Sequence, residues 1–231
     1  MTQSPTIVFD LDGTLVDTAP DLISALNFVL DREGLPPILL TEARSMIGAG
    51  VRKLIERGLE AEGRAIAVKE VDRMTADFID YYASHIAVAS RPFEGLERAL
   101  DDLTGKGCRL AVCTNKLEWL SKRLLDELGL SPRFAAICGA DTFGVAKPDP
   151  TILKQTVARA GGELSSTIMV GDAGTDIGVA RRAGVPVIGV SYGYTDVPIV
   201  ELKPDVLIHH MRDLPAAVGK LNSRQSQRIT P

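Results

Sequence analysis

The chain has 231 residues, of which 45% are hydrophobic, and its formal net charge is -4 at pH 7. These values predict a globular protein of one or two domains with a substantial core. The slightly acidic balance offers no basic face for polynucleotides, so we exclude nucleic acid as a partner. No apolar run approaches the roughly 20 residues that a membrane span needs, and residues 1–5 lack the features of a signal peptide. We therefore expect a cytoplasmic protein that does not bind membranes.

The first predicted element is a short buried strand at residues 7–9, where the sequence reads Ile-Val-Phe. A run this short, rich in branched and aromatic residues, is typical of a strand covered on both faces. Two carboxylates, Asp10 and Asp12, follow it, and Gly13 and Thr14 come next. A plain turn would explain Asp and Gly at a strand end. Two acids spaced in this way at the carboxyl end of a strand also fit the edge where open α/β sheets bind ligands.

The next predicted elements are three amphipathic helices, with no strand between Val16 and Ala89. Their apolar residues recur at helical spacing, and the first helix ends at Gly34 and the two prolines that follow. These residues are Leu22, Leu26, Val29 and Leu30; Val51, Leu54, Ile55 and Leu59; and Val71, Met74, Phe78 and Tyr82. The sequence therefore predicts a helical cap at 17–89 inserted into a core formed by 1–16 and 90–222.

Helices and strands alternate through the rest of the chain. The pattern predicts helices at 96–106, 117–128, 150–160 and 177–183, and strands at 109–113, 134–138, 168–170, 186–190 and 206–208. Such alternation with short links is characteristic of an α/β protein with a doubly wound, mostly parallel sheet. The polar residues 223–231 show no periodicity, so we expect a disordered tail there.

Polar side chains follow three of the predicted strands at one edge of the sheet. Asp10, Thr114 and Asp172 come at strand ends, and Lys147 precedes a predicted helix. Each has an ordinary alternative: Thr114 as a strand-end hydroxyl, and Lys147 as a surface charge. Together they would place repelling carboxylates side by side, which a divalent cation would relieve. Because the candidate ligands are oxygens only, the sequence predicts Mg²⁺.

The polar motifs resemble those of the haloacid dehalogenase superfamily of phosphatases. The similarity lies in the stretch Asp10–Thr14, in Thr114, in Lys147-Pro148 and in the stretch Gly171–Asp176, in that order, with the helical insert where the C1 cap of that superfamily lies. Further similarity to bacterial phosphoglycolate phosphatases lies in the stretches 34–37, 47–52, 114–116, 147–150 and 189–194. The resemblance implies an aspartyl-phosphate mechanism and 2-phosphoglycolate as a substrate.

The residues and the resemblance together assign roles. Asp10 would attack phosphorus, and Asp12 would be the general acid and base. Thr114, Asn115 and Lys147 would hold the phosphate. Mg²⁺ would be held by Asp10, Asp172 and the Asp12 carbonyl, with Asp176 orienting Lys147 or acting through water. Asp176 has the alternative of an acid at a helix N-terminus.

Three residues of the predicted cap are candidates for substrate recognition. Arg52, at the start of a cap helix, would read a substrate carboxylate with Gly48 and Gly50 beside it, or would be a solvated charge.

The predicted function is Mg²⁺-dependent hydrolysis of a small phosphate ester, with 2-phosphoglycolate giving glycolate and phosphate. Two alternatives remain open. A sugar phosphomutase would share Asp10 and Asp12, and a phospho-acceptor switch such as a receiver domain would also combine carboxylates, Thr and Lys on a parallel sheet. The inserted cap and Asp12 argue against the receiver. A monomer and a homo-oligomer are both compatible with the sequence.

Overall fold

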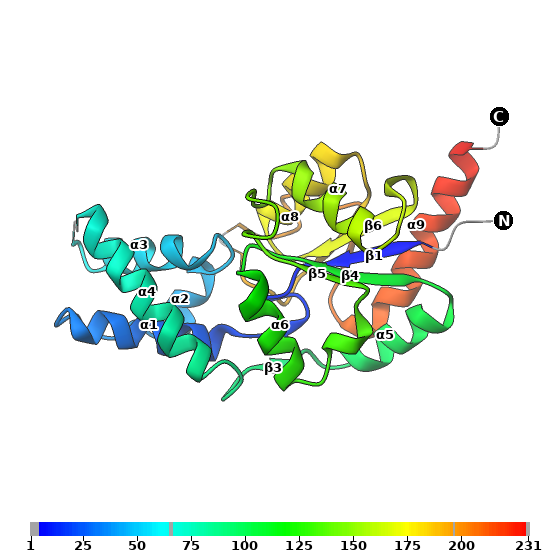
Figure 1. Ribbon diagram of the computed structural model, residues 1–231. Coiled ribbons are helices and arrows are strands. Elements are labelled where there is room, and N and C mark those ends of the chain that lie inside the picture. The colour runs from blue at the N-terminus through cyan, green and yellow to red at the C-terminus, as the bar shows by residue number, and fades with distance from the viewer. Residues whose placement is uncertain (1–4, 65–66, 196, 230–231) are drawn as a thin grey trace.

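A computed structural model describes residues 5–64, 67–195 and 197–229, with side chains described as far as residue 223. It consists of an α/β core and a helical cap at one end of that core (Figure 1). Among the described residues, no helix is both long enough and apolar enough to cross a membrane.

The core is built on a parallel sheet of six strands in the order β5-β4-β1-β6-β7-β8. The strand β1 (Thr6–Phe9) lies between β4 (Arg109–Cys113) and β6 (Thr167–Gly171), with Phe9 opposite Val112 and Val170. The remaining strands are β5 (Ala136–Cys138), β7 (Val187–Val190) and β8 (Val206–Ile208). This register brings the carboxyl ends of β1, β4 and β6 to one edge. The predicted α/β class and parallel sheet are confirmed.

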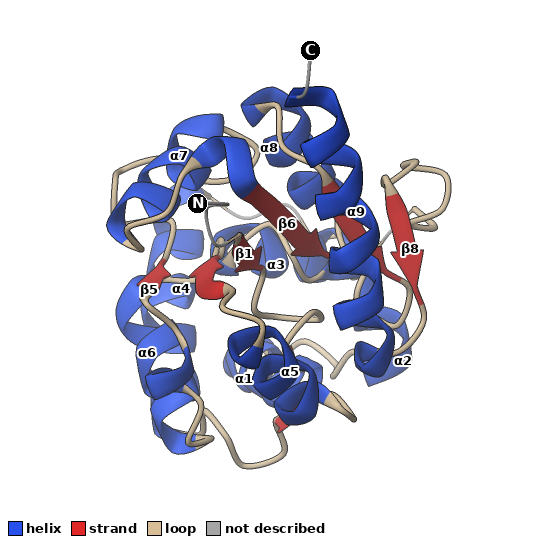
Figure 2. Cartoon of the chain, turned by 90° about the vertical axis from the view of Figure 1, so that its right-hand side faces the viewer, coloured by secondary structure: helices blue, strands red, loops and turns tan. Residues whose placement is uncertain are grey.

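Helices cover both faces of the sheet, as alternating β and α elements require. On one face lie α7 (Pro150–Arg159) and α8 (Gly174–Ala183), which pack on Val8, Ala111 and Met169. On the other lie α5 (Leu96–Gly105), α6 (Glu118–Glu127) and α9 (Leu214–Ile229). In Figure 2, α7 and α8 lie above the sheet and α5 below it. Since both faces are covered, the strands are almost continuously apolar.

The cap contains the three long helices that the sequence predicts. They are α1 (Ala19–Arg32), α3 (Val51–Ala61) and α4 (Val68–Ser84), and a short helix α2 (Leu40–Ala43) lies between the first two. Leu26, Ile55 and Phe78 are buried among them. The segments that join the cap to the core pair as an antiparallel ribbon of β2 (Val16–Asp17) and β3 (Arg91–Pro92). The expectation that no strand occurs between Val16 and Ala89 is therefore wrong at its first two residues.

The last helix corrects the prediction of a disordered tail. We expected no structure from residue 223 onward, but α9 continues to Ile229, and residues 230 and 231 lie outside the described part of the chain. The helix is held on the sheet by an apolar stripe at helical spacing. Its buried members are Leu214, Ala217, Val218 and Leu221. The polar tail extends a helix whose first half is fixed by packing.

Candidate active site

Asp10 emerges from the centre of the sheet, directly after β1, and the residue is 5% exposed. Its backbone N–H donates to the carbonyl of Val170, which continues the strand pairing by one residue. The Nζ of Lys147 lies 2.7 Å from Oδ1 of Asp10. Among the described residues, no hydrogen-bond donor other than this ammonium is found for Oδ1. Burial raises the pKa of Asp10 to about 6, and Lys147 opposes that rise.

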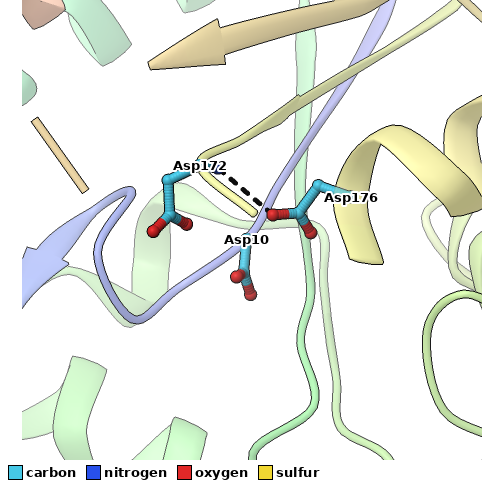
Figure 3. Close-up of side chains that lie close together, drawn as sticks. All are labelled: Asp10, Asp172 and Asp176. Carbon is cyan, nitrogen blue, oxygen red and sulfur yellow. Dashed lines mark hydrogen bonds between the residues drawn. The ribbon is translucent and has the colours of Figure 1, made fainter. Parts of the chain in front are cut away.

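Two more buried acids follow β6 and point toward Asp10 (Figure 3). Asp172 accepts hydrogen bonds from the Thr14 hydroxyl at 2.9 Å and from the Tyr194 N–H at 2.6 Å. Asp176, in the first turn of α8, accepts from the N–H groups of Asp172 and Ala173 and from Nζ of Lys147. Burial, together with the charges of Asp176 and Asp10, raises the pKa of Asp172 to about 8. The raised pKa shows that Lys147 alone does not balance the charge that the three carboxylates would carry if all were ionised.

The same three acids form a group suited to a hard cation. One carboxylate oxygen of each of Asp10, Asp172 and Asp176 lies within 4.8 Å of the others. All three are buried, and among the described residues Asp10 Oδ1 has no donor other than the ammonium of Lys147. Oxygen-only ligands with excess negative charge suit Mg²⁺ and not a softer metal. The residues present fit the predicted cofactor.

The loop between β1 and β2 fixes the spacing of these acids. Gly13 has φ of +80°, in the left-handed region that favours glycine, and a Cβ added there would lie 2.5 Å from Oδ2 of Asp172. The predicted order Asp-x-Asp-Gly-Thr thus has a steric basis: only glycine permits the Asp172 carboxylate to lie against this turn. Thr14 then supplies the hydroxyl that binds Asp172.

Asp12 lies in a different environment from Asp10. Both of its carboxylate oxygens accept from Nζ of Lys116, at 2.8 and 2.9 Å, and Oδ1 also accepts from the Thr18 hydroxyl at 2.8 Å. Its carboxylate is not part of the group formed by Asp10, Asp172 and Asp176. The predicted metal contact through the Asp12 carbonyl stays a prediction. The two acids have different partners: Asp10 contacts Lys147, and Asp12 contacts Lys116.

Thr114 and Asn115 follow β4 at the same edge. Thr114 is 2% exposed and its Oγ1 accepts from the N–H of Lys116. The Asn115 amide has other partners: its oxygen accepts from the Lys147 N–H at 2.8 Å, and its nitrogen donates to the carbonyls of Lys147 and Gly48 at 3.3 Å. Asn115 therefore joins the Lys147 loop to the cap. If Asn115 bound phosphate as predicted, it would have to break at least one of these hydrogen bonds.

A cavity opens between the rim of the core and the cap. The core side presents Asp10, Asp12, Thr114, Asn115 and Lys116, and the cap side presents Leu22, Ile47, Gly48, Gly50, Val51 and Leu54. Gly48 and Gly50 thus lie where the sequence predicted them. The cap wall contains no charged side chain among the described lining residues.

Arg52 is not brought to this cavity. Its guanidinium is partly exposed and pairs with the carboxylates of Asp72 and Glu56 on the cap helices. The geometry therefore gives no support to the predicted contact between Arg52 and a substrate carboxylate.

Lys116 and Tyr194 lie in the stretches 114–116 and 189–194 that carry the resemblance, but neither was assigned a role in the site from the sequence. Lys116 directly follows Thr114 and Asn115, and a third polar residue at a strand end was a usable signal. Tyr194 lies after β7; its N–H donates to Asp172 and its hydroxyl to Asp17. No local pattern shows that a backbone N–H would reach a carboxylate 22 residues away.

Comparison with known proteins agrees with this geometry. A family model described as haloacid dehalogenase-like hydrolase matches residues 7–190. The chain belongs to the haloacid dehalogenase-like hydrolase family. The predicted superfamily is confirmed, and the match includes the acids after β1 and β6 and the inserted cap.

Members of this family with similar sequences bear one name. A phosphoglycolate phosphatase of Caulobacter vibrioides is 48% identical over 92% of this chain and 90% of its own length. Another from Agrobacterium fabrum is 45% identical, over 96% of this chain and 95% of its own. A crystal structure described as a predicted phosphoglycolate phosphatase of Haemophilus somnus covers 94% of this chain and 99% of its own, with a TM-score of 0.85 and 29% identity. The resemblance to phosphoglycolate phosphatases is therefore confirmed over nearly the whole chain.

Proposed function

We propose that this chain is a Mg²⁺-dependent phosphatase that hydrolyses 2-phosphoglycolate to glycolate and phosphate. The observation that carries the chemistry is the separation of Asp10 and Asp12, which share one turn but have different partners. The observation that carries the substrate is the name of relatives up to 48% identical over 92% of the chain.

The first half of the reaction transfers the phosphoryl group from the substrate to the enzyme. A carboxylate oxygen of Asp10 attacks phosphorus while the ester P–O bond breaks, which leaves an aspartyl phosphate. Asp12, on the cavity side, gives a proton to the departing oxygen. Lys147 lies close enough to Asp10 to balance charge on the transferring group. The hydroxyl of Thr114, at the same edge, would bind an oxygen of that group.

The second half returns the enzyme to its starting state. Asp12 takes a proton from water as the water attacks the aspartyl phosphate, and the bond between Asp10 and phosphorus breaks. Asp10 and Asp172 would hold Mg²⁺, which would supply positive charge for the phosphate oxygens. Asp176 acts by fixing Lys147 and the backbone after β6 through its three hydrogen-bond partners. Asp10 is thus the nucleophile and Asp12 the general acid and base, while Asp172 would hold the metal and Asp176 positions Lys147.

Steady-state turnover on a panel of esters tests this proposal. We expect 2-phosphoglycolate to give the highest kcat/KM, with phosphate released in equal amount to glycolate and activity lost in EDTA and restored by Mg²⁺. Glucose 1-phosphate serves as the comparison because it separates hydrolysis from transfer. Conversion of it to glucose 6-phosphate, with little free phosphate, would favour the phosphomutase alternative and contradict the proposal.

A further inference from the structure

The cavity between core and cap must also bind the carboxylate of the proposed substrate. A substrate with a carboxylate must bury that group against the cap, because the cap wall is formed by Leu22, Ile47, Val51 and Leu54 with two glycines. Transfer of an unpaired carboxylate into such surroundings is strongly unfavourable. A cation that faces the cavity is therefore needed, and Arg52 pairs with other acids instead.

Lys116 is the one cation among the described residues that line this cavity. Its side chain is 4% exposed, and its Nζ lies 4.7 Å from the centre of the Tyr82 ring, which comes from the cap helix α4. Burial is the largest influence on the pKa of Lys116 and lowers it, but the contacts with Asp12 and Tyr82 together raise it above the ordinary value. The ammonium therefore stays charged at the edge of a cavity whose cap wall is apolar.

The position of Lys116 relative to Asp12 matches the shape of a short hydroxy-acid phosphate. Asp12 must reach the ester oxygen that departs, so the leaving group lies beside Asp12. In 2-phosphoglycolate the carboxyl carbon is bonded to the carbon that bears this oxygen. The Nζ of Lys116 is 2.8 Å from Oδ1 of Asp12. A cation bonded to Asp12 is therefore within reach of a carboxylate that is one carbon away from the departing oxygen.

Lys116 also has the capacity for another acceptor. An ammonium carries three N–H donors. In the structure these face the two oxygens of Asp12 and the π face of Tyr82. A carboxylate is a much stronger acceptor than an aromatic ring, so it would take the donor that faces Tyr82. One side chain can then contact Asp12 and substrate together.

We propose that Lys116 is the specificity residue that reads the substrate carboxylate from the core side of the cavity. The inference deepens the proposed function and rests on it. It assigns recognition of the phosphate and of the carboxylate to core residues and leaves the cap to exclude water and larger groups. Recognition by Arg52, or by the N–H groups at the start of α3, is the competing account.

The test compares 2-phosphoglycolate with 2-hydroxyethyl phosphate, in which a neutral CH₂OH replaces the carboxylate. We define the preference as the ratio of the two kcat/KM values. Because Lys116 contacts Asp12, Lys116→Met will slow both substrates. Loss of a charge-assisted contact should in addition lower the preference by about 10- to 100-fold, mainly because the carboxylate-bearing ester binds more weakly and its KM rises. Lys116→Arg should restore much of the preference, because it keeps the charge.

Controls separate this role from a structural one. Lys122→Met makes the same change at an exposed lysine of α6 and should leave the preference at the parent value. Arg52→Met tests the competing account directly. If Lys116→Met does not fold, as judged by circular dichroism, Lys116→Gln provides a smaller uncharged side chain for the same ratio.

The outcomes distinguish an error in the role of Lys116 from an error in the proposed function. A preference that is unchanged in the uncharged Lys116 variant, or that collapses in Arg52→Met instead, would overturn the role of Lys116 while leaving the phosphatase intact. A parent enzyme that hydrolyses both esters equally would overturn both the substrate and this role. A parent enzyme that hydrolyses neither would show that the proposed function itself is wrong.

Discussion

The two walls of the cavity differ in the burial and pairing of their charged side chains. On the core side, buried charges are paired at short distance, as in Lys147 with Asp10 and Asp176 at 2.7 Å. On the cap, the charges pair away from the cavity and are partly exposed, as in Arg32 with Asp77 at 3.0 Å. Buried pairs break at high cost, whereas exposed pairs contribute little to stability. The core rim therefore fixes the chemistry, and the cap contributes shape.

This comparison predicts that loss of the nucleophile at the rim affects every ester alike, whereas changes on the cap wall alter the relative rates of esters of different size. The largest effect is expected for Asp10→Asn, because an amide of the same shape cannot attack phosphorus. Turnover of alkyl and aryl esters should both fall by about 10⁴-fold or more. Asp102→Asn, at an exposed position of α5, is the matched control and should keep parent activity. Retained hydrolysis in Asp10→Asn would remove the covalent step.

A methyl group added at Gly13 should damage the metal site by displacing the carboxylate of Asp172. A Cβ at Gly13 would lie 2.5 Å from Oδ2 of Asp172. We expect Gly13→Ala to weaken activation by Mg²⁺ about 10- to 100-fold, as displaced ligand supports do. Gly129 also has positive φ, at +69°, but nothing lies within 4 Å of its Cβ position. Gly129→Ala should cost about 1 kcal/mol of stability and leave the Mg²⁺ dependence unchanged. Equal Mg²⁺ titrations for the two variants would contradict this role of Gly13.

The charged rim should make the stability of the metal-free protein depend on pH. The pKa of Asp172 is raised from 3.8 to about 8, so the native state keeps a proton that the unfolded state has released. The resulting stability is present below about pH 4 and is lost as pH rises toward about 8. We expect the free energy of unfolding in EDTA, measured with urea, to fall as pH rises through this window.

Two controls assign that fall to the rim. Mg²⁺ should reduce it, because the ion stabilises the ionised carboxylates. Asp172→Asn, which cannot titrate, should show a smaller fall than the parent. An Asp172→Asn profile that parallels the parent would contradict the assignment.

The smallest effect on activity is expected on the cap wall. Leu54 is 3% exposed and lines the cavity. Leu54→Ala should cost about 2 to 5 kcal/mol of stability and raise the relative kcat/KM of bulkier esters by about 10-fold. Leu39, also in the cap segment but 63% exposed, is the control position. An equal loss of rate for small and bulky esters in Leu54→Ala would show that the cap wall acts on the chemistry as well.

Much of the core could be predicted because its signals are local. Each strand is an apolar run that ends in a polar residue, and the parallel topology brings Asp10, Thr114 and Asp172 to one edge. Asp149 also follows a local rule, since its side chain caps α7 by accepting from the Thr151 N–H at 2.8 Å. The helix α9 carried an equally regular stripe, yet its polar second half concealed it.

The partners across the cavity could not be predicted, because they depend on tertiary contacts. Arg52 lies in a suggestive position after two glycines, but Asp72, on the next cap helix, takes its guanidinium. Lys116 reaches Asp12 from 104 residues away in sequence. Asn115 has the right type for phosphate binding and instead bridges Lys147 and Gly48. Spacing along the chain identifies which residues reach the edge of the sheet but leaves their pairing undetermined.

In the proposed mechanism, Asp10 carries the phosphoryl group, whereas Asp12 donates and accepts the protons. Asp12→Asn separates these roles. With an aryl ester, whose phenolate leaves without a proton, the first transfer should proceed in this variant. Water must still lose a proton in the second transfer, so the aspartyl phosphate should accumulate.

Rapid mixing of Asp12→Asn with an aryl phosphate, followed by mass spectrometry of the quenched enzyme, measures both events. We expect one burst of phenolate per active site, after which turnover stops with phosphate bound covalently to Asp10. Steady turnover near the parent rate, with no phosphate trapped on the protein, would contradict it.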